Sequence, residues 1–586
     1  MASNYLAKGL KRSALTVALG LCFAGGVQAQ STTGGINGSA PAGSTVTVTN
    51  NSGFTRTVTV DANGRFNINN LPVGNYTVTS GSEKREVVVT VGSSAAASFG
   101  GAATTLGTVT VTGTTIAPID TTTLDTRSVV TAQQLQRLPL ARSAEAIALL
   151  APGAVNGAAG FFGGLVSFGG AGVSENAYYV NGFFTGEPVS NLGGFTLPYQ
   201  AIEQQETFLG GYSAKYGRSD GGVINQIGKR GTNDWHFGGQ VTYIPKSLRG
   251  KPEDVYFPNI SLPSGYTYQN TTQPGTLHQR GKDNVTWSHS YTAYASGPII
   301  KDRLFFFALG EWNRSETTTT PTALASAQRL TDNTTKNPKL YGKLDWSITD
   351  NHFLEYTYLS DKSDRTGEYY AYTFSDGSIG SKLSVVPDPF YQKNEFNILK
   401  YTGYLTDTLT LSALYGESTL HKRQINPSIL PGVPLLGGVS NQNPAITGGT
   451  PITNNQSGAV GINAKDKSKG TRVDLEWVLG RHTLTAGIDN IKFEAFNEGQ
   501  DQLVDRWIYG RTTSNIVPGH VGSPASPSNP NGYYAYKLIF KTATSMSLDQ
   551  KAYYLEDRWQ ITDNFLLSLG IRNDKFVNRN NVGEAY

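Results

Sequence analysis

The segment "YGRSDGGVINQIGKRG" (216–231) gathers charged and glycine residues into one stretch of the chain. Its charged side chains could form structural ion pairs, or they could bind a charged ligand. We favour the ion pairs, because charges inside a fold are usually paired. Two adjacent glycines allow close backbone approach, but no GxxxxGK[ST] pattern is present, so the segment is not a phosphate loop. The charged candidates are Arg218, Asp220, Lys229 and Arg230.

Patterns for catalysis and metal binding are missing from the sequence. The seven histidines are dispersed, and none belongs to an HExxH motif or to a pair with ligand spacing. No GxSxG pattern marks a serine nucleophile. The sequence therefore predicts no catalytic residue, no metal site, no cofactor and no enzyme. The histidines are His236, His278, His289, His352, His421, His482 and His520.

A short strand-like stretch, "LGTVTVTG" (106–113), stands between two segments rich in Gly, Ala, Ser and Thr. Its alternating Val and Thr side chains favour an extended backbone, because both are β-branched. The free N–H and C=O groups of such a peptide can pair with the exposed edge of another protein's sheet. The alternative is an ordinary strand of a neighbouring domain. The residues that would pair are Thr108, Val109, Thr110, Val111 and Thr112.

The first 29 residues predict a secretory signal peptide. Lys8, Lys11 and Arg12 precede a short apolar stretch, and residues 27–29 form a small-residue cleavage site. The single cysteine, Cys22, lies inside this segment, so the predicted mature chain uses no disulfide. Losing the three basic residues lowers the formal net charge from +4 to +1, which implies no broad attraction to nucleic acid.

Residues 30–100 contain several short alternating runs separated by turn sequences, which predicts a small β-sandwich. Asp61-Ala-Asn-Gly64, followed by Leu71-Pro-Val-Gly74, resembles the carboxypeptidase regulatory-like domain, a transthyretin-like sandwich without catalytic residues. Asp61 could be a cation ligand, but Asp-x-Asn-Gly is common hairpin chemistry and predicts a turn. Residues 101–124 form a linker that carries the strand-like stretch.

Residues 125–233 predict a mixed α/β unit. Two helical patterns are followed by Asn181-Gly182 between apolar runs, which is a strong signal for a β-hairpin. Ser143 is placed to cap the second helix, and Pro152-Gly153 is placed to end it. The glycine-rich apolar stretch 157–170 could touch a ligand or pack beneath the strands that follow, and the sequence favours neither.

Residues 234–586 alternate strands of about ten residues with short turns on one side and long polar loops, such as 361–390, on the other. Within strands the faces separate, and Leu340, Leu344 and Trp346 share one side. A soluble β-sandwich would also alternate. The uniform strand length and the asymmetric connections are instead typical of outer-membrane β-barrels. The short turns are predicted at 299–303, 347–351, 405–408, 479–482 and 560–564.

About eleven strands are predicted in this part of the chain. Bacterial single-chain barrels have an even number of strands, and the last residues, "RNNVGEAY", are polar and loop-like. We therefore expect the chain to be incomplete at its C-terminus. Eleven strands could not close around a domain of the size of residues 125–233, because barrel diameter grows with strand number.

Several ordered motifs together resemble the TonB-dependent outer-membrane receptors. They are the strand-like stretch, "SAEAIALLAPGAV" (143–155), "AYYVNGFFT" (177–185) and the long motif 202–231. "SGPIIKDRLFFFALGEW" (296–312) resembles the early barrel of the Oar-like subgroup, in which a carboxypeptidase regulatory-like domain precedes the plug. The resemblance implies a mainly β chain with a small sandwich, a plug at 125–233, and about eleven strands of an expected 22-stranded transmembrane barrel at 234–586.

The resemblance also implies the site and the partners. Residues 108–112 would be the TonB box, which binds a TonB-type periplasmic energy-transducing protein. The four charged candidates would contact the barrel wall or hold the plug during gating. The implied function is energised uptake of a large or scarce ligand, such as a siderophore, carbohydrate or peptide, across the outer membrane of a Gram-negative bacterium. The alternatives are an outer-membrane adhesion, secretion or surface-organising protein, and a passive porin, which a folded plug disfavours.

Overall fold

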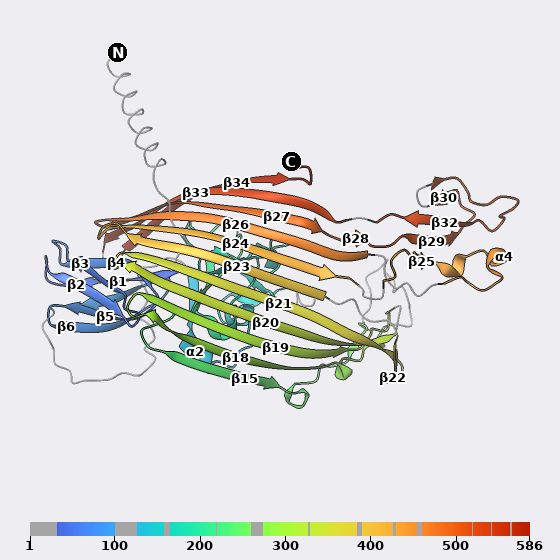
Figure 1. The fold of residues 1–586 in the computed structure, drawn as a ribbon, viewed down its shortest axis with the longest axis horizontal. Helices are drawn as coiled ribbons and strands as arrows, with labels where there is room; N and C mark the ends of the chain where they lie inside the picture. Colours follow the sequence, from blue (N-terminus) through green and yellow to red (C-terminus); the bar gives the residue numbers. More distant parts are fainter. Residues whose placement is uncertain are drawn as a thin grey trace, which may run out of the picture.

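The computed structural model describes residues 32–99, 126–157, 164–217, 219–259, 274–325, 328–383, 390–425, 429–453, 460–517, 520–540, 542–562 and 565–586. Three units follow one another in them: a pair of small sheets, a mixed unit, and a large antiparallel sheet (Figure 1). The predicted mainly β fold class is confirmed. No helix in these ranges is long and apolar enough to cross a bilayer. The predicted signal peptide (1–29) and TonB box (108–112) lie outside the described residues.

The N-terminal unit, which we call the sandwich, has two sheets around one apolar core. Val46 and Val48 alternate with more exposed threonines on β2 and are fully buried. Asp61 shapes a turn, because its Oδ1 accepts the backbone N–H groups of Asn63 and Arg65 at 2.8 Å each. The sheets are β4 (Arg65–Pro72), β1 (Thr33–Ser39) and β7 (Ser94–Ser98); and β3 (Thr55–Thr59), β2 (Thr45–Asn50), β5 (Gly74–Ser80) and β6 (Glu83–Val89).

The second unit, which we call the plug, is built on a five-stranded sheet of order β12-β11-β14-β13-β8. The hairpin forms where the sequence predicts it, with Asn181 and Gly182 at φ 48° and 88° between paired β11 and β12. The strands are β8 (Thr126–Thr131), β11 (Ala177–Val180), β12 (Phe183–Phe184), β13 (Ile202–Gly210) and β14 (Val223–Gly228). Around them lie α2 (Ala132–Arg137), α3 (Ala144–Ala148), β9 (Ala154–Asn156), β10 (Val166–Phe168), η1 (Val173–Glu175) and η2 (Tyr199–Ala201).

Helix α3 begins as predicted but ends earlier. The Ser143 Oγ accepts the Ala146 N–H at 3.1 Å, which satisfies a free donor of the first turn. The helix stops at Ala148 rather than at the Pro-Gly pair. The backbone there switches to tighter three-residue turns, since the Ala151 N–H donates to the Ala148 carbonyl.

The third unit, which we call the wall, is a 13-stranded sheet in which β22 and β28 pair beside one path of eleven strands. This number agrees with the predicted count. Within the described residues the first and last strands of the path, β15 and β34, do not pair, so the sheet is open. The path is β15 (His236–Ile244), β18 (Val285–Ile300), β19 (Leu304–Thr319), β20 (Arg329–Thr349), β21 (His352–Thr373), β23 (Phe390–Tyr404), β24 (Leu409–Gln424), β26 (Val460–Leu479), β27 (His482–Glu498), β33 (Thr544–Thr562) and β34 (Phe565–Arg579).

Strand lengths depart from the prediction of about ten residues. β20 and β21 contain 21 and 22 residues, and β21 runs into the predicted loop 361–390. From Asp361 to Glu368 the extension is polar on both faces, so this part lacks the apolar alternation that marks a half-buried strand. Backbone pairing continues the ladder through it, from Lys336 opposite Asp364 to Arg329 opposite Ala371, where the Arg329 guanidinium also lies over the Tyr369 ring at 4.4 Å.

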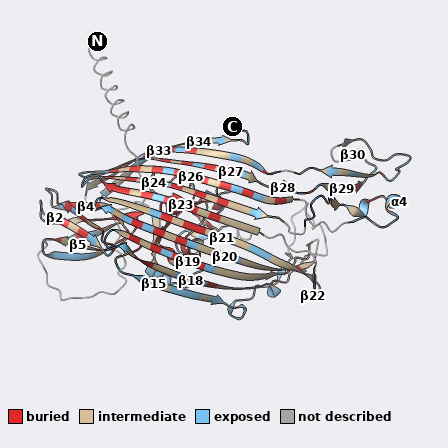
Figure 2. Cartoon of the chain, viewed as in Figure 1, coloured by how far each residue is buried: buried red, intermediate tan, exposed pale blue. Residues whose placement is uncertain are grey.

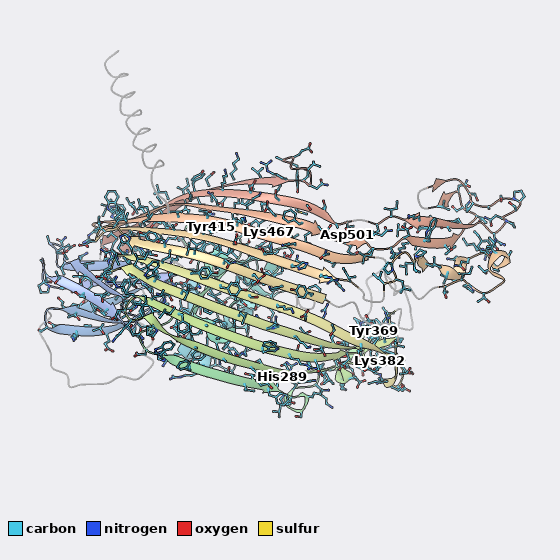
Figure 3. The ribbon with its side chains drawn as sticks, viewed as in Figure 1. His289, Tyr369, Lys382, Tyr415, Lys467 and Asp501 are labelled. Carbon is cyan, nitrogen blue, oxygen red and sulfur yellow. The ribbon has the colours of Figure 1, made fainter. Side chains whose placement is uncertain are left out.

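The long connections gather at the end of the wall opposite the short turns (Figure 1). Tyr369 and Lys382 lie there (Figure 3), where Lys382 pairs with Glu368. The small elements outside the path are β16 (Val255–Tyr256), β17 (Leu277–Gln279), β22 (Ser378–Lys382), β25 (Leu435–Gly437), β28 (Asp501–Gln502), β29 (Arg506–Arg511), β30 (Ile516–Val517), β31 (His520–Val521), β32 (Tyr533–Leu538), η3 (Lys246–Leu248), η4 (Gly281–Asp283), η5 (Val439–Asn441) and α4 (Pro444–Thr447).

The two faces of the wall differ in polarity. On β20, Leu340 and Trp346 are 53% and 47% exposed, whereas Lys343 and Asp345 are buried. Figure 2 shows buried and more exposed residues alternating along the strands of the wall. Apolar side chains outside and polar ones inside are the reverse of a soluble sandwich. They suit a strand with lipid on one face and protein or water on the other.

Tryptophans mark the outer rim of the wall beside the short turns. Trp346, Trp477 and Trp559 are exposed, and each lies opposite the first residues of the neighbouring strand, Leu304, Leu409 and His482. Amphipathic rings at one level are typical of the interfacial girdle of a membrane barrel. With short turns on the periplasmic side, this end of the wall faces the periplasm.

Candidate functional site

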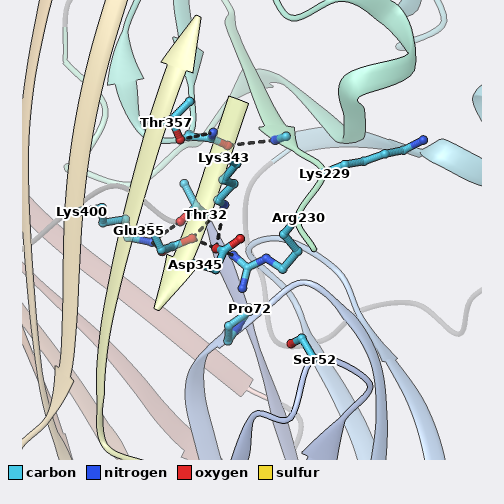
Figure 4. A network of polar contacts seen from close by, with 12 residues as sticks. Thr32, Ser52, Pro72, Lys229, Arg230, Lys343, Asp345, Glu355, Thr357 and Lys400 are labelled. Carbon is cyan, nitrogen blue, oxygen red and sulfur yellow. Dashed lines mark hydrogen bonds and ion pairs between the residues drawn. The ribbon is translucent and has the colours of Figure 1, made fainter. Parts of the chain in front are cut away.

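The side chain of Arg230 reaches from the end of the plug to the inner face of the wall. β14 ends at Gly228, and the chain then carries the Arg230 guanidinium between two carboxylates (Figure 4). Its Nη2 lies 2.7 Å from Glu355 Oε1 and 3.7 Å from Asp345 Oδ1. The plug and the wall are therefore joined by an ion pair at this point.

Two lysines of the wall complete a charged cluster around Glu355. Lys343 Nζ lies 2.9 Å from Glu355 Oε1, and Lys400 Nζ lies 3.3 Å from Glu355 Oε2. Lys400 also donates to the hydroxyl of Thr32, at the start of the sandwich. The cluster thus contacts all three units of the chain. It consists of Arg230, Lys343, Asp345, Glu355 and Lys400.

The protonation of Arg230 is secured by its partners. Burial alone would lower the pKa of the guanidinium, but Asp345 and Glu355 outweigh burial and raise that pKa above its ordinary value. Arg230 therefore keeps its charge at any pH that the folded chain meets.

The other three predicted residues occupy different surroundings. Lys229 extends away from the cluster (Figure 4), and burial lowers the pKa of its ammonium while Glu203 opposes that shift. Asp220 is exposed, and its backbone N–H donates to the carbonyl of Glu175 within the plug. Arg218 lies outside the described residues. A role for these residues in gating stays a prediction.

Asn181 ties the hairpin of the plug to both β14 and the wall. Its Oδ1 accepts the Gly228 N–H at 2.8 Å, and its Nδ2 donates to Thr357 Oγ1 at 3.0 Å. The Tyr341 hydroxyl donates to the Lys229 carbonyl at 3.0 Å, next to the hydrogen bonds of Asn181. The backbone that carries Arg230 is therefore held on both sides before the arginine reaches the cluster.

Two substitutions of Asn181 should weaken these contacts to different extents. Asn181→Gly removes the side-chain hydrogen bonds and should destabilise the chain by about 1–2 kcal/mol. Asn181→Ala removes the same bonds and adds left-handed backbone strain, for about 1 kcal/mol more. Urea unfolding of the full chain in detergent measures both. Equal stability of the two variants would contradict the strain at this φ of 48°.

Further anchors hold the plug around its circumference. The Arg142 guanidinium donates to Gln240 Oε1 at 2.7 Å and lies 3.4 Å from Glu311. Lys422 on β24 pairs with Glu187 of the plug at 2.8 Å. These contacts are ion pairs and hydrogen bonds between side chains rather than strand pairing.

Apolar contacts supplement the polar anchors, because plug residues such as Leu197 and wall residues such as Leu309 share one buried cluster. The Phe183 ring packs edge-on against Phe396 at 6.2 Å between centroids. It also lies against Gly416 of the wall, where an added Cβ would come within 2.3 Å of the ring. A glycine on the wall strand is what lets the ring approach this closely.

A polar recess of about 350 Å³ lies between the plug and the inner face of the wall, on strands β19 to β23. Phe195 is the plug residue that lines this recess. The carboxylate that lines it, Asp361, is paired with Lys339 at 3.1 Å and accepts from Asn337 at 2.8 Å. The remaining described side chains of the lining are neutral amides and hydroxyls: Asn313, Ser315, Thr335, Asn337, Ser363 and Gln392.

The glycine-rich stretch 157–170 is described only in part. Val166 and Phe168 are buried in a plug cluster with Ile224, so this portion packs inside the plug, and residues 158–163 lie outside the described ones. Among the described residues, no group of three or more His, Cys, Asp or Glu is placed to hold a metal ion.

The wall residues of the charged cluster were missed from the sequence, although a signal for them exists. Lys343 and Asp345 alternate with the apolar Leu344 and Trp346. A charge on the inner face of a membrane-spanning strand needs a partner inside the barrel. Which partner it meets depends on contacts between residues far apart in the sequence, such as Arg230 and Asp345.

Two family models match the chain. "TonB-dependent Receptor Plug Domain" matches residues 120–224, and "Outer membrane beta barrel domain" matches residues 321–584. The chain is 31% identical to the TonB-dependent transporter Oar of Myxococcus xanthus over 167 residues, which are 28% of this chain and 14% of that protein.

A solved structure agrees with the fold. The outer membrane transporter YddB from Escherichia coli superposes with a TM-score of 0.50 at 14% identity, covering 79% of this chain and 57% of that one. The siderophore receptor PirA from Acinetobacter baumannii gives a TM-score of 0.45 at 18% identity, covering 77% and 58%. The chain thus spans less than two thirds of the length of these relatives.

Proposed function

The chain belongs to the TonB-dependent receptors of the Gram-negative outer membrane, and from that premise we propose that it imports a large or scarce ligand with energy delivered from the periplasm. Proteins of this family are transporters and receptors, in agreement with the prediction that the chain is not an enzyme. The energy would come through a TonB-type protein that pairs with residues 108–112.

The observation that carries the proposal is how the plug is seated. Within the described residues no strand of the plug pairs with a strand of the wall. The plug is held instead by side-chain contacts: ion pairs such as Arg230 on Glu355 and Glu187 on Lys422, and buried apolar clusters shared with the wall. Such a barrier can be unseated by a pull and reseated without rebuilding a sheet. A passive porin would gain nothing from this arrangement.

The polar recess is the candidate place of ligand capture. Its wall residues lie farther along the strands toward the long loops than Asp345 and Glu355 do, and its lining side chains donate and accept hydrogen bonds. Its carboxylate is already neutralised by Lys339, and none of the described residues that line it is a cation. This lining supports a neutral, hydrogen-bonding ligand over an anionic chelate.

Solute depletion from growth medium tests import even while the ligand is unidentified. Cells with the full chain should deplete at least one solute, detected by mass spectrometry, that cells carrying a deletion of residues 106–113 leave behind. A protonophore should abolish the difference, because the transport step needs the proton-motive force. No depleted solute, together with a surface phenotype that survives the deletion, would favour the adhesion or surface-organising alternative.

A further inference from the structure

The sandwich is docked on the periplasmic end of the wall. Phe54 packs against Phe353 with ring centroids 4.9 Å apart, and Arg56 stacks over Tyr404 at 3.9 Å. The Arg56 Nη2 also donates to the Asp407 carbonyl in a short turn, at 3.1 Å. Phe54, Arg56 and Tyr404 are each 6% exposed or less, so this contact excludes solvent.

The docked surface extends along the wall beyond this aromatic contact. Asn69 and Asn70 both donate to Glu476 Oε1 on β26, at 2.9 and 3.1 Å. The Tyr404 hydroxyl on β23 donates to the Asn70 carbonyl at 2.6 Å. The sandwich therefore bridges several neighbouring strands across the end through which a ligand would leave.

The sandwich also contacts the plug. The Arg127 guanidinium donates to the Gly92 carbonyl at 2.8 Å while it pairs with Glu206, and the Val91 N–H donates to Gln204 Oε1 at 2.9 Å. Through Thr32 and Lys400 the sandwich reaches the charged cluster as well. Wall, plug and sandwich thus share one set of contacts at the periplasmic mouth.

These contacts are separable. Within the described residues no strand of the sandwich pairs with the plug or the wall. The docked surface consists of side-chain hydrogen bonds, a few rings, a small apolar cluster of Val73, Val91 and Ile227, and a backbone hydrogen bond from the Asn233 N–H to the Asn51 carbonyl at 3.3 Å. The sandwich can therefore separate from the plug and the wall as a folded body, and only the contacts of this surface have to break.

The two bodies flank the predicted TonB box. The sandwich ends with β7 at Ser98, and the plug begins with β8 at Thr126. A pull applied to residues 108–112 is transmitted to both neighbours at once.

We propose that the sandwich is a gate that closes the periplasmic mouth and that the pull releases it together with the plug. The proposal rests on energised import as the function. It assigns the N-terminal sandwich a role in transport that the plug and the barrel alone do not require.

Cysteine accessibility tests the gate and needs no identified ligand. Ser52→Cys detects whether the sandwich has separated from the wall, because Ser52 is buried at the docked surface beside Phe353 and Thr402. Ser418→Cys detects whether the plug has moved away from the wall. Ser418 is buried on the inner face of β24, two residues after Gly416, where the Phe183 ring of the plug packs. Both changes are nearly isosteric. The unaltered chain, whose single cysteine lies at position 22, gives the background.

Fluorescein maleimide labelling is compared in energised cells and in cells treated with a protonophore. Labelling at both reporters should rise several-fold in energised cells. A rise at Ser418→Cys alone would overturn the gate and leave import standing, and no rise at either would overturn both. A rise at Ser52→Cys alone would overturn the joint release.

A disulfide between the two bodies provides a second test. Asn70→Cys with Glu476→Cys joins side chains that contact each other in the docked state, and oxidation should abolish energised labelling at Ser418→Cys until a reductant is added. The matched control is Thr47→Cys with Thr57→Cys, a cross-strand pair within the sandwich, which should leave labelling unchanged. Full labelling with the first disulfide closed would contradict a gate.

Discussion

Replacing Val111 by proline should abolish energised transport while surface binding of ligand persists. If residues 108–112 add a strand to the edge of a TonB-type protein, each N–H and C=O on one side contributes to the pairing. Proline removes one donor and therefore one hydrogen bond of the ladder, and leaving the partner acceptor unpaired costs about 1–3 kcal/mol. That cost corresponds to a loss of affinity of roughly five- to a hundredfold.

Binding of a purified TonB periplasmic domain to the full chain in detergent measures this effect directly. Thr114→Pro is the matched control, because position 114 follows Gly113, where the predicted strand ends. It should bind as the unaltered chain does. A Val111→Pro chain that still bound TonB and supported full uptake would refute the box at 106–113 and return the segment to the role of an ordinary strand.

Glu355→Gln should destabilise the seated plug more than any other single change in the charged cluster. Glu355 is the carboxylate that contacts Arg230, Lys343 and Lys400 together. Its side chain is 14% exposed, so water replaces little of the lost attraction. Removing one partner from a buried ion pair costs about 3–5 kcal/mol, because the remaining charges stay uncompensated.

Arg230→Gln should cost less, because Lys343 and Lys400 still neutralise Glu355. Lys229→Gln is the matched control at the adjacent position, since its side chain points away from the cluster (Figure 4). Urea unfolding of the full chains in detergent ranks the three variants. Equal losses at Glu355 and Lys229 would show that the cluster does not hold the plug.

Local features were predictable from sequence because short-range physics decides them. Asn181-Gly182 forms its turn because both residues accept positive φ. Ser143 caps α3 because its Oγ is positioned by the helix start alone. The inward and outward faces of β20 follow from the period of two along a strand.

Strand ends were not predictable in the same way. The apolar alternation stops where the wall rises beyond the plug and both faces are polar, yet the backbone continues to pair. The long loops were therefore predicted too long, as at β21, which reaches Thr373. The polar stretch from Asp361 to Glu368 carries no side-chain pattern that distinguishes a paired strand from a loop.

By itself the sequence determined the kind of architecture. Short turns make consecutive strands neighbours, and local patterns predict a capped plug helix, a hairpin and a wall with one apolar face. The tertiary structure alone decided which charges meet. Arg230 contacts Glu355, and Asn70 contacts Glu476, only because the register of the wall strands points the two carboxylates inward where the plug and the sandwich present their partners. A slip of one residue in a wall strand would turn its carboxylate toward lipid. Contacts between distant strands carry no local signature, so the seat of the plug and the docking of the sandwich could not be predicted from the sequence.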